Sequence, residues 1–346
     1  MRVAVVTVGD PQRLTGGYLY NRRLLEGLRE RGVGAEQVVA SGASPEEQAG
    51  AANGFCDAFD PAAYDVVIVD TLSRIVCGPH LDHWRSVRPV VALVHELPGV
   101  ADPAIAERER PFEGSALRSD RLVAVSEHGK EVLQGRDVPE ERIFVVPPGF
   151  DRLVRGQKFE RTANHAPNVL CVAQWIPRKG VLDLVRSWKL EDRTGSVLHL
   201  VGETDADAGY ARDVRDAISR EPSVVVHGPV DDEALADLYA SADVFAVPSR
   251  YEGYGIVYAE ALSFGLPVVA CRVGPIPELV GDAALLVPPE DPEALSEALA
   301  RLLSDAGLRE KMSGAARRRA AELPSWSDTV DGFLGVLREA VEERGR

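Results

Sequence analysis

The chain has 346 residues, enough for about two domains at roughly 150 residues each, which excludes a small disulfide-stabilised module. Hydrophobic residues make up 45% and charged residues 27% of the chain, and this balance excludes the intrinsically disordered and fibrous classes. The net charge of −15 argues against a nucleic-acid partner, because nucleic acid is bound through basic surface.

Short valine-rich runs alternate with stretches of helical periodicity in the first half of the chain. The N-terminal run in MRVAVVTVGD is too short for a secretory signal and too rich in β-branched residues for a helix, so it predicts a first strand. The clearest helix covers residues 18–31, where Tyr20, Leu24 and Leu28 share one face. The predicted strands of this half are residues 3–8, 38–40, 66–69, 90–94, 121–125 and 143–146.

A polar passage without periodicity, residues 152–168, predicts a linker. Helices follow from about residue 289, and the last one is expected to begin at Ser327. We therefore expect a first domain of residues 1–150, to which a C-terminal helix of about residues 328–346 returns, and a second domain of residues 151–327. The predicted strands of the second half are residues 169–173, 197–201, 224–227, 244–247, 268–270 and 284–287.

The alternation of strands and helices is typical of βαβ units that feed a parallel sheet, so the predicted fold class is α/β. Two such series in tandem predict two Rossmann-like, doubly wound domains that face each other across a cleft. Ligands of open α/β sheets bind outside the carboxyl ends of the strands, and we expect the functional site there.

Membrane spans and disulfides are not predicted. No apolar run reaches the 18 or so residues that a spanning helix requires, and the four cysteines are far apart and form no CxxC pair. These features favour a reducing cytoplasm and give no indication of a zinc site.

The segment 243–282 carries the most chemical information. A buried strand there is followed by a turn with Glu252, Gly253 and Gly255, and then by a helix that carries Glu260. Glycines at the start of a helix let backbone N–H groups approach an anion, so the turn predicts a phosphate site. The two carboxylates suit hydroxyl groups, because each accepts two hydrogen bonds.

This stretch, with EGYG before the helix and LPVVA after it, resembles the second domain of the family 4 retaining glycosyltransferases, which have the GT-B fold. The resemblance implies that Glu252 contacts the donor sugar and Glu260 the ribose of a nucleotide. It also implies that the amides of Gly253, Tyr254, Gly255, Ile256 and Val257 contact the diphosphate or the sugar. The alternative is a plain turn residue at 252 and a solvated helix residue at 260.

The loop after the first strand of the second domain carries Arg178 and Lys179. Adjacent cations at a helix entrance suit a diphosphate leaving group, and the resemblance gives them that role, although an Arg-Lys pair taken alone is usually a solvated loop. The family usually has an arginine directly after this strand, where this chain has Gln174, so the resemblance leaves the role of Gln174 open.

In the first domain the resemblance implies that Gly16 and Gly17 face the donor diphosphate and that His95 lies close to the reacting centre. His95 follows a buried strand, where a hydrogen bond to a sugar or an acceptor is expected, against the alternative of a packed histidine. In the second domain it implies that Gly202 borders the donor and that the loop from Gly228 to Asp231, with Val230, lies near the base.

With this resemblance the sequence predicts a metal-independent glycosyltransferase without a cofactor, which uses a UDP-, GDP- or ADP-linked sugar as co-substrate. The resemblance also implies that the sugar keeps its anomeric configuration. Asp231 and Asp232 are interpreted as a helix cap rather than as a metal site. A small hydroxyl acceptor is favoured over a lipid-linked one, and the expected location is the cytoplasm or the inner membrane surface. The alternatives are a nucleotide-sugar epimerase of the same fold and a non-catalytic sugar-nucleotide binder.

Overall fold

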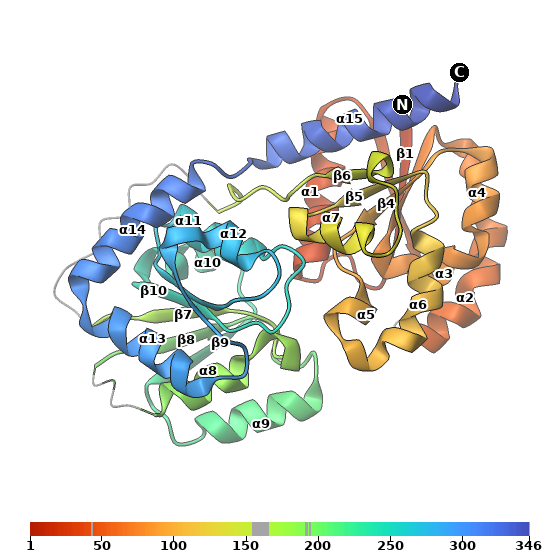
Figure 1. The fold of residues 1–346 in the computed structure, drawn as a ribbon. Helices are drawn as coiled ribbons and strands as arrows, with labels where there is room; N and C mark the ends of the chain where they lie inside the picture. The colour runs from red at the N-terminus through yellow and green to blue at the C-terminus, as the bar shows by residue number, and fades with distance from the viewer. Residues whose placement is uncertain (43, 154–165, 191–192, 194, 346) are drawn as a thin grey trace. The chain divides into compact units, whose positions relative to one another are not determined.

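The computed structural model divides into two units (Figure 1). The first consists of Met1–Gly149 and Pro324–Arg346, and the second of Phe150–Leu323. The structure describes residues 1–42, 44–153, 166–190, 193 and 195–345. Most of the predicted linker, residues 154–165, lies outside the described residues.

The first unit contains a sheet of parallel strands in the order β2-β1-β3-β4-β5-β6. The chain runs from β1 outward to β2 and then returns to β3, so the direction of winding reverses between β1 and β3. Such a reversal opens a crevice at the carboxyl ends of these two strands. The strands are β1 Arg2–Val8, β2 Gly34–Ala40, β3 Val66–Asp70, β4 Val90–Val94, β5 Arg121–Ala124 and β6 Ile143–Val145.

Helices cover both faces of this sheet. On one face Phe59 and Trp84 pack against Val67 and Val69, and on the other α1 and α15 pack against each other. Local signals set some of the ends: Ser44 begins α2 with a capping box, in which side-chain and backbone groups satisfy each other. The helices are α1 Gly16–Glu30, α2 Pro45–Ala58, α3 Arg74–Cys77, α4 Leu81–Val87, α5 Pro98–Ala101, α6 Ala106–Ala116, α7 Glu127–Gln134 and α15 Trp326–Arg344.

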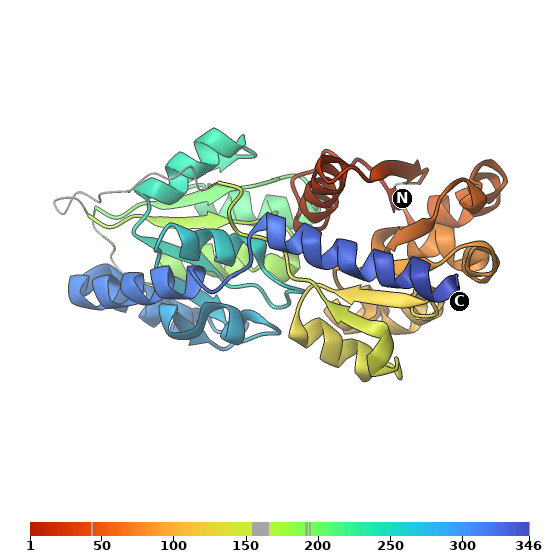
Figure 2. The ribbon, with the colours of Figure 1, turned by 90° about the horizontal axis from the view of Figure 1, so that it is seen from above.

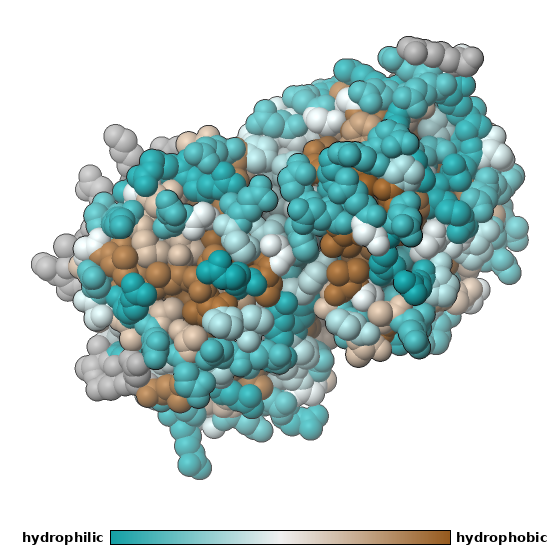
Figure 3. All heavy atoms as spheres, in the orientation of Figure 1, coloured by the Kyte–Doolittle hydropathy of each residue, from teal (hydrophilic) through white to brown (hydrophobic). Residues whose placement is uncertain are grey.

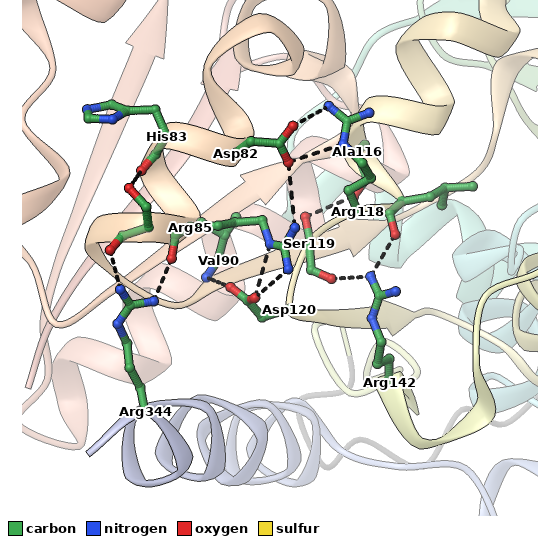
Figure 4. Close-up of polar contacts among 12 residues, drawn as sticks. Asp82, His83, Arg85, Val90, Ala116, Arg118, Ser119, Asp120, Arg142 and Arg344 are labelled. Carbon is green, nitrogen blue, oxygen red and sulfur yellow. Dashed lines mark hydrogen bonds and ion pairs between the residues drawn. The ribbon is translucent and has the colours of Figure 1, made fainter. Parts of the chain in front are cut away.

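Helix α15 belongs to the first unit although it comes last in the chain, and Figure 2 shows it lying along that unit. Its fully buried Phe333 contacts the ring of Tyr20 edge to face, and its Val330 fits beside Gly27. A Cβ atom on Gly27 would lie 2.5 Å from Val330 Cγ2, so glycine is what permits this close packing. At its far end Arg344 donates hydrogen bonds to the backbone carbonyls of Arg85 and Ser86 in α4 (Figure 4).

The second unit repeats the arrangement with the strand order β12-β11-β10-β7-β8-β9, again all parallel. Here the winding reverses between β7 and β10. The strands are β7 Val169–Val172, β8 Leu198–Val201, β9 Val224–Gly228, β10 Val244–Val247, β11 Val268–Cys271 and β12 Ala284–Val287.

The helices of the second unit also lie on both sides of the sheet, with α8 between α9 and α13 on one face and α11 against α12 and α14 on the other (Figure 1). Their apolar side chains join those of the strands in one core. The helices are α8 Val181–Trp188, α9 Ala208–Ile218, α10 Asp232–Ser241, α11 Ile256–Ser263, α12 Ile276–Val280, α13 Pro292–Ser304 and α14 Ala306–Ala320.

The predicted α/β class and all the predicted strands are confirmed. Strand β2 begins four residues before its predicted start. The prediction missed Gly34–Gln37 because this part of an edge strand alternates polar and buried positions and lacks an apolar run. On the face drawn in Figure 3 hydrophilic residues predominate, with hydrophobic patches between them on both units. None of the helices in the described parts of the chain has the length and apolar character that a membrane span requires.

Candidate functional site

The loops that follow β7 and β10 meet at the point where the second sheet reverses its winding. Gly180, in the loop after β7, has a φ of 66°, and a Cβ atom there would lie 2.3 Å from the carbonyl oxygen of Pro248, which directly follows β10. The backbone N–H of Arg250 also donates to the carbonyl of Arg178 at 2.8 Å. Glycine at 180 therefore allows the contact between two loops that are some 70 residues apart in sequence.

Lys179 and Glu252 form an ion pair across these two loops. The distance from Lys179 Nζ to Glu252 Oε1 is 2.7 Å, and the Glu252 side chain is only 6% exposed. Ser249 Oγ donates to the same carboxylate oxygen at 2.7 Å. Burial acts to raise the pKa of Glu252, but Lys179 and Arg178 lower it below its ordinary value. Glu252 is therefore a buried turn residue that is held as a carboxylate.

Arg178 shares this loop junction. Its Nη1 atom donates to the carbonyl of Tyr251 at 3.4 Å, and its short helix, Pro177–Lys179, leads directly into α8. The neighbouring Arg250 is bound to Asp183 at 2.8 Å. The predicted cations, Arg178 and Lys179, thus lie beside the Glu252 turn.

The turn after Glu252 leads into α11 through Gly255, which has a φ of 97°. A Cβ atom on Gly255 would lie 2.7 Å from the ring of Tyr258, so only glycine fits. Because the N-cap residue is Gly255, no side chain at this position accepts hydrogen bonds from the first backbone N–H groups of α11, and the first turn contains no acidic residue. Among the predicted amide donors, Ile256 and Val257 are the first helical residues, and Gly253 and Tyr254 lie partly buried in the turn. A negatively charged group would be stabilised at this helix start.

Glu260 lies on α11 and is almost fully buried, with partners that the sequence did not indicate. Arg152 Nη2 donates to Glu260 Oε1 at 2.7 Å, and the hydroxyl of Tyr239 donates to Oε2 at 3.2 Å. Arg152 is also paired with Asp232. Burial raises the pKa of Glu260 above its ordinary value, although Arg152 offsets part of this effect. No spacing rule links residues 152, 239 and 260, so only the tertiary fold brings them together.

The remaining predicted residues of the second unit lie at strand ends. Gln174 Nε2 donates to Glu203 Oε2 at 2.5 Å, which links the ends of β7 and β8. Gly202 has a φ of 128°, and a Cβ atom there would lie 2.2 Å from the carbonyl of Ala173. Val230 is partly buried against the core.

The first unit has a second cluster of predicted residues at its own switch point. Gly16 and Gly17 are the first residues of α1, which has no side-chain cap and no acid in its first turn. His95 follows β4 directly, and a Cβ atom on Gly17 would lie 3.2 Å from its ring. The structure therefore brings His95 and Gly17 together.

His95 is held by residues that the sequence analysis did not assign to it. Its Nε2 atom lies 3.2 Å from Asn21 Oδ1 and 3.8 Å from Asp70 Oδ1, and the ring of Tyr20 contacts it edge to face. Burial lowers the pKa of His95, and Asp70 and Glu96 offset only part of this effect. Asp70 left a signal in the sequence, because it ends a run of four apolar residues in β3.

Asp231 is the N-cap of α10 and accepts from the backbone N–H of Ala234 at 2.9 Å. Asp232 is paired with Arg152. In the parts of the chain that the structure describes, no group of three or more His, Cys, Asp or Glu side chains is placed to hold a metal ion.

Two family models match separate parts of this chain. The model for glycosyl transferases group 1 matches residues 166–305, and that for Glycosyltransferase Family 4 matches residues 41–152. The chain is 30% identical over 314 residues to D-inositol 3-phosphate glycosyltransferase of Geodermatophilus obscurus, a match that covers 82% of this chain and 68% of that protein. Overall, the chain spans 54% to 68% of the length of the curated relatives that it matches.

Solved structures with the same fold cover the chain almost completely. Sucrose-phosphate synthase from Thermosynechococcus elongatus matches with a TM-score of 0.83 and 25% identity, over 98% of both chains. Anabaena HepE in complex with UDP-glucose matches with a TM-score of 0.80 and 18% identity, over 98% of this chain and 100% of that one. These likenesses confirm the predicted GT-B fold.

Proposed function

The chain belongs to the family of group 1, or family 4, glycosyltransferases, and from this premise we propose that it transfers a sugar from a nucleotide-diphosphate donor to a hydroxyl group. We further propose that the sugar keeps its anomeric configuration and that no metal takes part. The observation that carries the proposal is the junction of the two loops in the second unit. It places two cations and the carboxylate of Glu252 next to an uncapped helix start.

The diphosphate is proposed to bind Arg178, Lys179 and the first N–H groups of α11. Arginine and lysine suit phosphate because they offer several charged donors, and a helix N-terminus adds backbone donors and a favourable dipole. In the free protein the charge of Lys179 is balanced by Glu252. A bound diphosphate would compete for Lys179 and free the Glu252 carboxylate to accept hydrogen bonds from the sugar.

The nucleoside is proposed to reach Glu260, with its ribose hydroxyls donating to the carboxylate. Each oxygen of Glu260 already accepts a hydrogen bond, from Arg152 on one side and Tyr239 on the other. A carboxylate has about four lone-pair positions, so the ribose can be added without breaking both contacts. Arg152 and Tyr239 would then orient Glu260. Gly202 is assigned to the border of the donor, and Val230 to the surroundings of the base.

Charge stabilisation is proposed to supply most of the rate. As the glycosidic bond breaks, negative charge grows on the leaving diphosphate, where Arg178 and Lys179 offset it. The departing phosphate is proposed to take the proton of the attacking hydroxyl on the same face of the sugar, which preserves the configuration. Gly16, Gly17 and His95 of the first unit are assigned to the same reaction, with His95 binding a hydroxyl group.

A small soluble acceptor is proposed over a lipid-linked one. The chain is similar to D-inositol 3-phosphate glycosyltransferase and to sucrose-phosphate synthase, and both are named after small soluble molecules, which supports this choice. We propose that the protein works in the cytoplasm, where a reducing environment suits its four free cysteines, three of which are buried.

A thermal-shift screen against UDP, GDP, ADP, TDP and their sugar conjugates tests the donor. A ligand that binds only the native state raises the melting temperature, so one nucleotide is expected to raise it selectively. The shift should disappear in Glu260→Ala and persist in Glu297→Ala, which changes an exposed glutamate of the same unit. No shift with any of these ligands at millimolar concentration would contradict the proposal. Product analysis then separates transfer from epimerisation, because an epimerase converts the donor without an acceptor.

A further inference from the structure

A chain of buried polar side chains begins at the end of β3 in the first unit. Asp70 is fully buried, and its carboxylate accepts hydrogen bonds from three donors. Its Oδ2 atom accepts from Thr7 Oγ1 at 2.9 Å and from Asn21 Nδ2 at 2.5 Å, and its Oδ1 atom accepts from the backbone N–H of Leu72 at 2.9 Å. An ionised carboxylate is an acceptor only, so these donors satisfy it as the charged form.

The Asp70 carboxylate fixes the orientation of the Asn21 side chain, which is itself fully buried. Because a carboxylate cannot donate, the amide nitrogen of Asn21 must face it, and the opposite orientation would place two acceptors against each other. The amide oxygen of Asn21 therefore points away from Asp70. It lies 3.2 Å from Nε2 of His95.

The orientation of Asn21 in turn decides which ring nitrogen of His95 carries the proton. An amide oxygen only accepts, so Nε2 must be the donor in this contact. The second oxygen of Asp70, 3.8 Å from the same Nε2, favours a proton there as well. Tyr20 packs edge to face against the ring, and Gly17 lies so close that a Cβ atom there would be 3.2 Å from it, so both residues restrict rotation of the ring.

The other ring nitrogen is left available. Within the described residues no hydrogen bond to Nδ1 of His95 is present, and this atom is not among the buried polar atoms that lack a partner. The side chain keeps 13% of its surface exposed. A neutral imidazole with its proton on Nε2 has an acceptor lone pair on Nδ1.

We infer that Asp70 and Asn21 are positioning residues that hold His95 as its neutral Nε2–H tautomer, so that Nδ1 accepts a hydrogen bond from a substrate hydroxyl. The second half of this statement rests on the proposed glycosyl transfer. An acceptor lone pair on Nδ1 excludes the diphosphate as its partner, because an ionised phosphate has no proton to donate. The hydroxyl belongs either to the donor sugar or to the acceptor, and the experiment below separates these two sources.

The free protein labelled with ¹⁵N-histidine tests the tautomer directly by NMR. His95→Gln identifies the resonances of this side chain, and at neutral pH its Nε2 is expected at the protonated position and its Nδ1 at the unprotonated one. A protonated Nδ1, or a ring that averages between the two tautomers, would overturn the inference. The result does not depend on any ligand, so it stands or falls apart from the proposed function.

Asp70→Asn tests the coupling. The charged groups near the ring are the carboxylates of Asp70 and Glu96, which both raise its pKa. Removing the Asp70 charge is therefore expected to lower the pKa of His95 and to allow a mixture of tautomers. Thr7→Val, which removes one donor to Asp70 and keeps the charge, is the matched control and should leave the tautomer unchanged. An unchanged pKa and tautomer in a folded Asp70→Asn protein would contradict the positioning role.

Ligand additions then identify the hydroxyl. If it belongs to the donor sugar, UDP-glucose shifts the Nδ1 resonance and UDP does not. If it belongs to the acceptor, D-inositol 3-phosphate added with UDP produces the shift. Protonation of Nδ1 by UDP alone would overturn the acceptor role, because it would show an imidazolium facing phosphate. If none of these probes binds, a UDP-linked donor is excluded, while the tautomer of the free protein still decides the positioning role.

Discussion

The ammonium group of Lys179 lies 2.7 Å from the carboxylate of Glu252, although the two residues are 73 positions apart in the chain. The pair joins the loops after β7 and β10, the two strands between which the second sheet reverses its winding. Two largely buried charged side chains thus lie next to each other at the point where open α/β sheets bind ligands. The pair carries consequences for stability as well as for donor binding.

Breaking this pair from one side should destabilise the protein. Lys179→Met leaves Glu252 as a buried charge without its main partner, and the expected cost is about 3 kcal/mol in the free energy of unfolding. Lys179→Met combined with Glu252→Met should recover much of that loss, because no unpaired charge remains. Urea unfolding measures the free energy of unfolding of the wild type, of Lys179→Met and of the double variant. Equal destabilisation in the single and the double variant would argue against a coupled pair.

Lys179→Met and Glu252→Gln should each lose activity while the fold remains intact. Glu252→Gln keeps the size of the side chain and removes its charge, and loss of a preorganised electrostatic contact typically lowers kcat by about 100-fold or more. The measurement is steady-state transfer from the donor that the thermal-shift screen identifies. Circular dichroism serves as the control for folding, and two fully active, folded variants would remove Lys179 and Glu252 from the proposed site.

Acidification should weaken the wild-type protein partly through Glu252. Its folded pKa lies below the ordinary value of 4.5, so the native state binds the proton more weakly than the unfolded state. The resulting stability is present above pH 4.5 and is lost as the pH falls through the lower, folded pKa. In Glu252→Gln this part of the acid dependence should be absent. Urea unfolding at a series of pH values makes the comparison.

Glu260 should show the opposite sign. Burial raises its folded pKa above 4.5, so the native state binds the proton more tightly, and stability is lost as the pH rises from 4.5 through the folded pKa. Relative to Glu260→Gln, the wild-type protein should therefore gain stability on acidification through this range. A difference that runs in the other direction would show that Arg152 outweighs burial.

Gly180 should tolerate no side chain. Gly180→Ala combines the strain of a left-handed backbone, about 1 kcal/mol, with a Cβ atom 2.3 Å from the carbonyl oxygen of Pro248. Gly228→Ala is the matched comparison in the same unit, because its φ of 69° is similar and nothing lies within 4 Å of the added atom. Thermal unfolding should show a clearly larger loss for Gly180→Ala. A similar loss in both variants would mean that the contact with Pro248 relaxes easily.

Helix α15 should contribute to stability through its apolar face. Phe333→Ala empties a fully buried position against Tyr20 and is expected to cost about 3 to 5 kcal/mol. Asp331→Ala, two residues earlier, removes the exposed partner of Arg31 and should cost far less, because solvent screens an exposed ion pair. Urea unfolding of the two variants distinguishes packing from surface charge as the source of stability.

Gln174→Arg should strengthen diphosphate binding. Arginine there would still pair with Glu203, which now accepts from the Gln174 amide at 2.5 Å, and would add a positive charge to the proposed phosphate site. We expect a several-fold lower dissociation constant for the nucleoside diphosphate, with a gain that shrinks at high salt. Calorimetric titration at two salt concentrations checks this, and Gln174→Met, which adds no charge, should show no gain.

The sequence determined the two series of buried strands, because the interior strands of a parallel sheet are continuous apolar runs that can be recognised without knowing their neighbours. It also indicated the residue types of the proposed donor site through one short stretch, 243–282, in which Glu252, the glycines and Glu260 follow one another. The start of β2 escaped the same reasoning, because an edge strand is half exposed and its polar residues hide the pattern.

Only the tertiary structure decided which charges neutralise one another. Lys179 is paired with Glu252 and Arg152 with Glu260, across long separations in sequence. Asn21 likewise contacts both Asp70 and His95, which are distant from it in sequence. Hydrophobic periodicity records which face of an element is buried and says nothing about which loop lies opposite. Those pairings depend on strand order and winding, since the order places the ends of β7 and β10, and of β1 and β3, side by side.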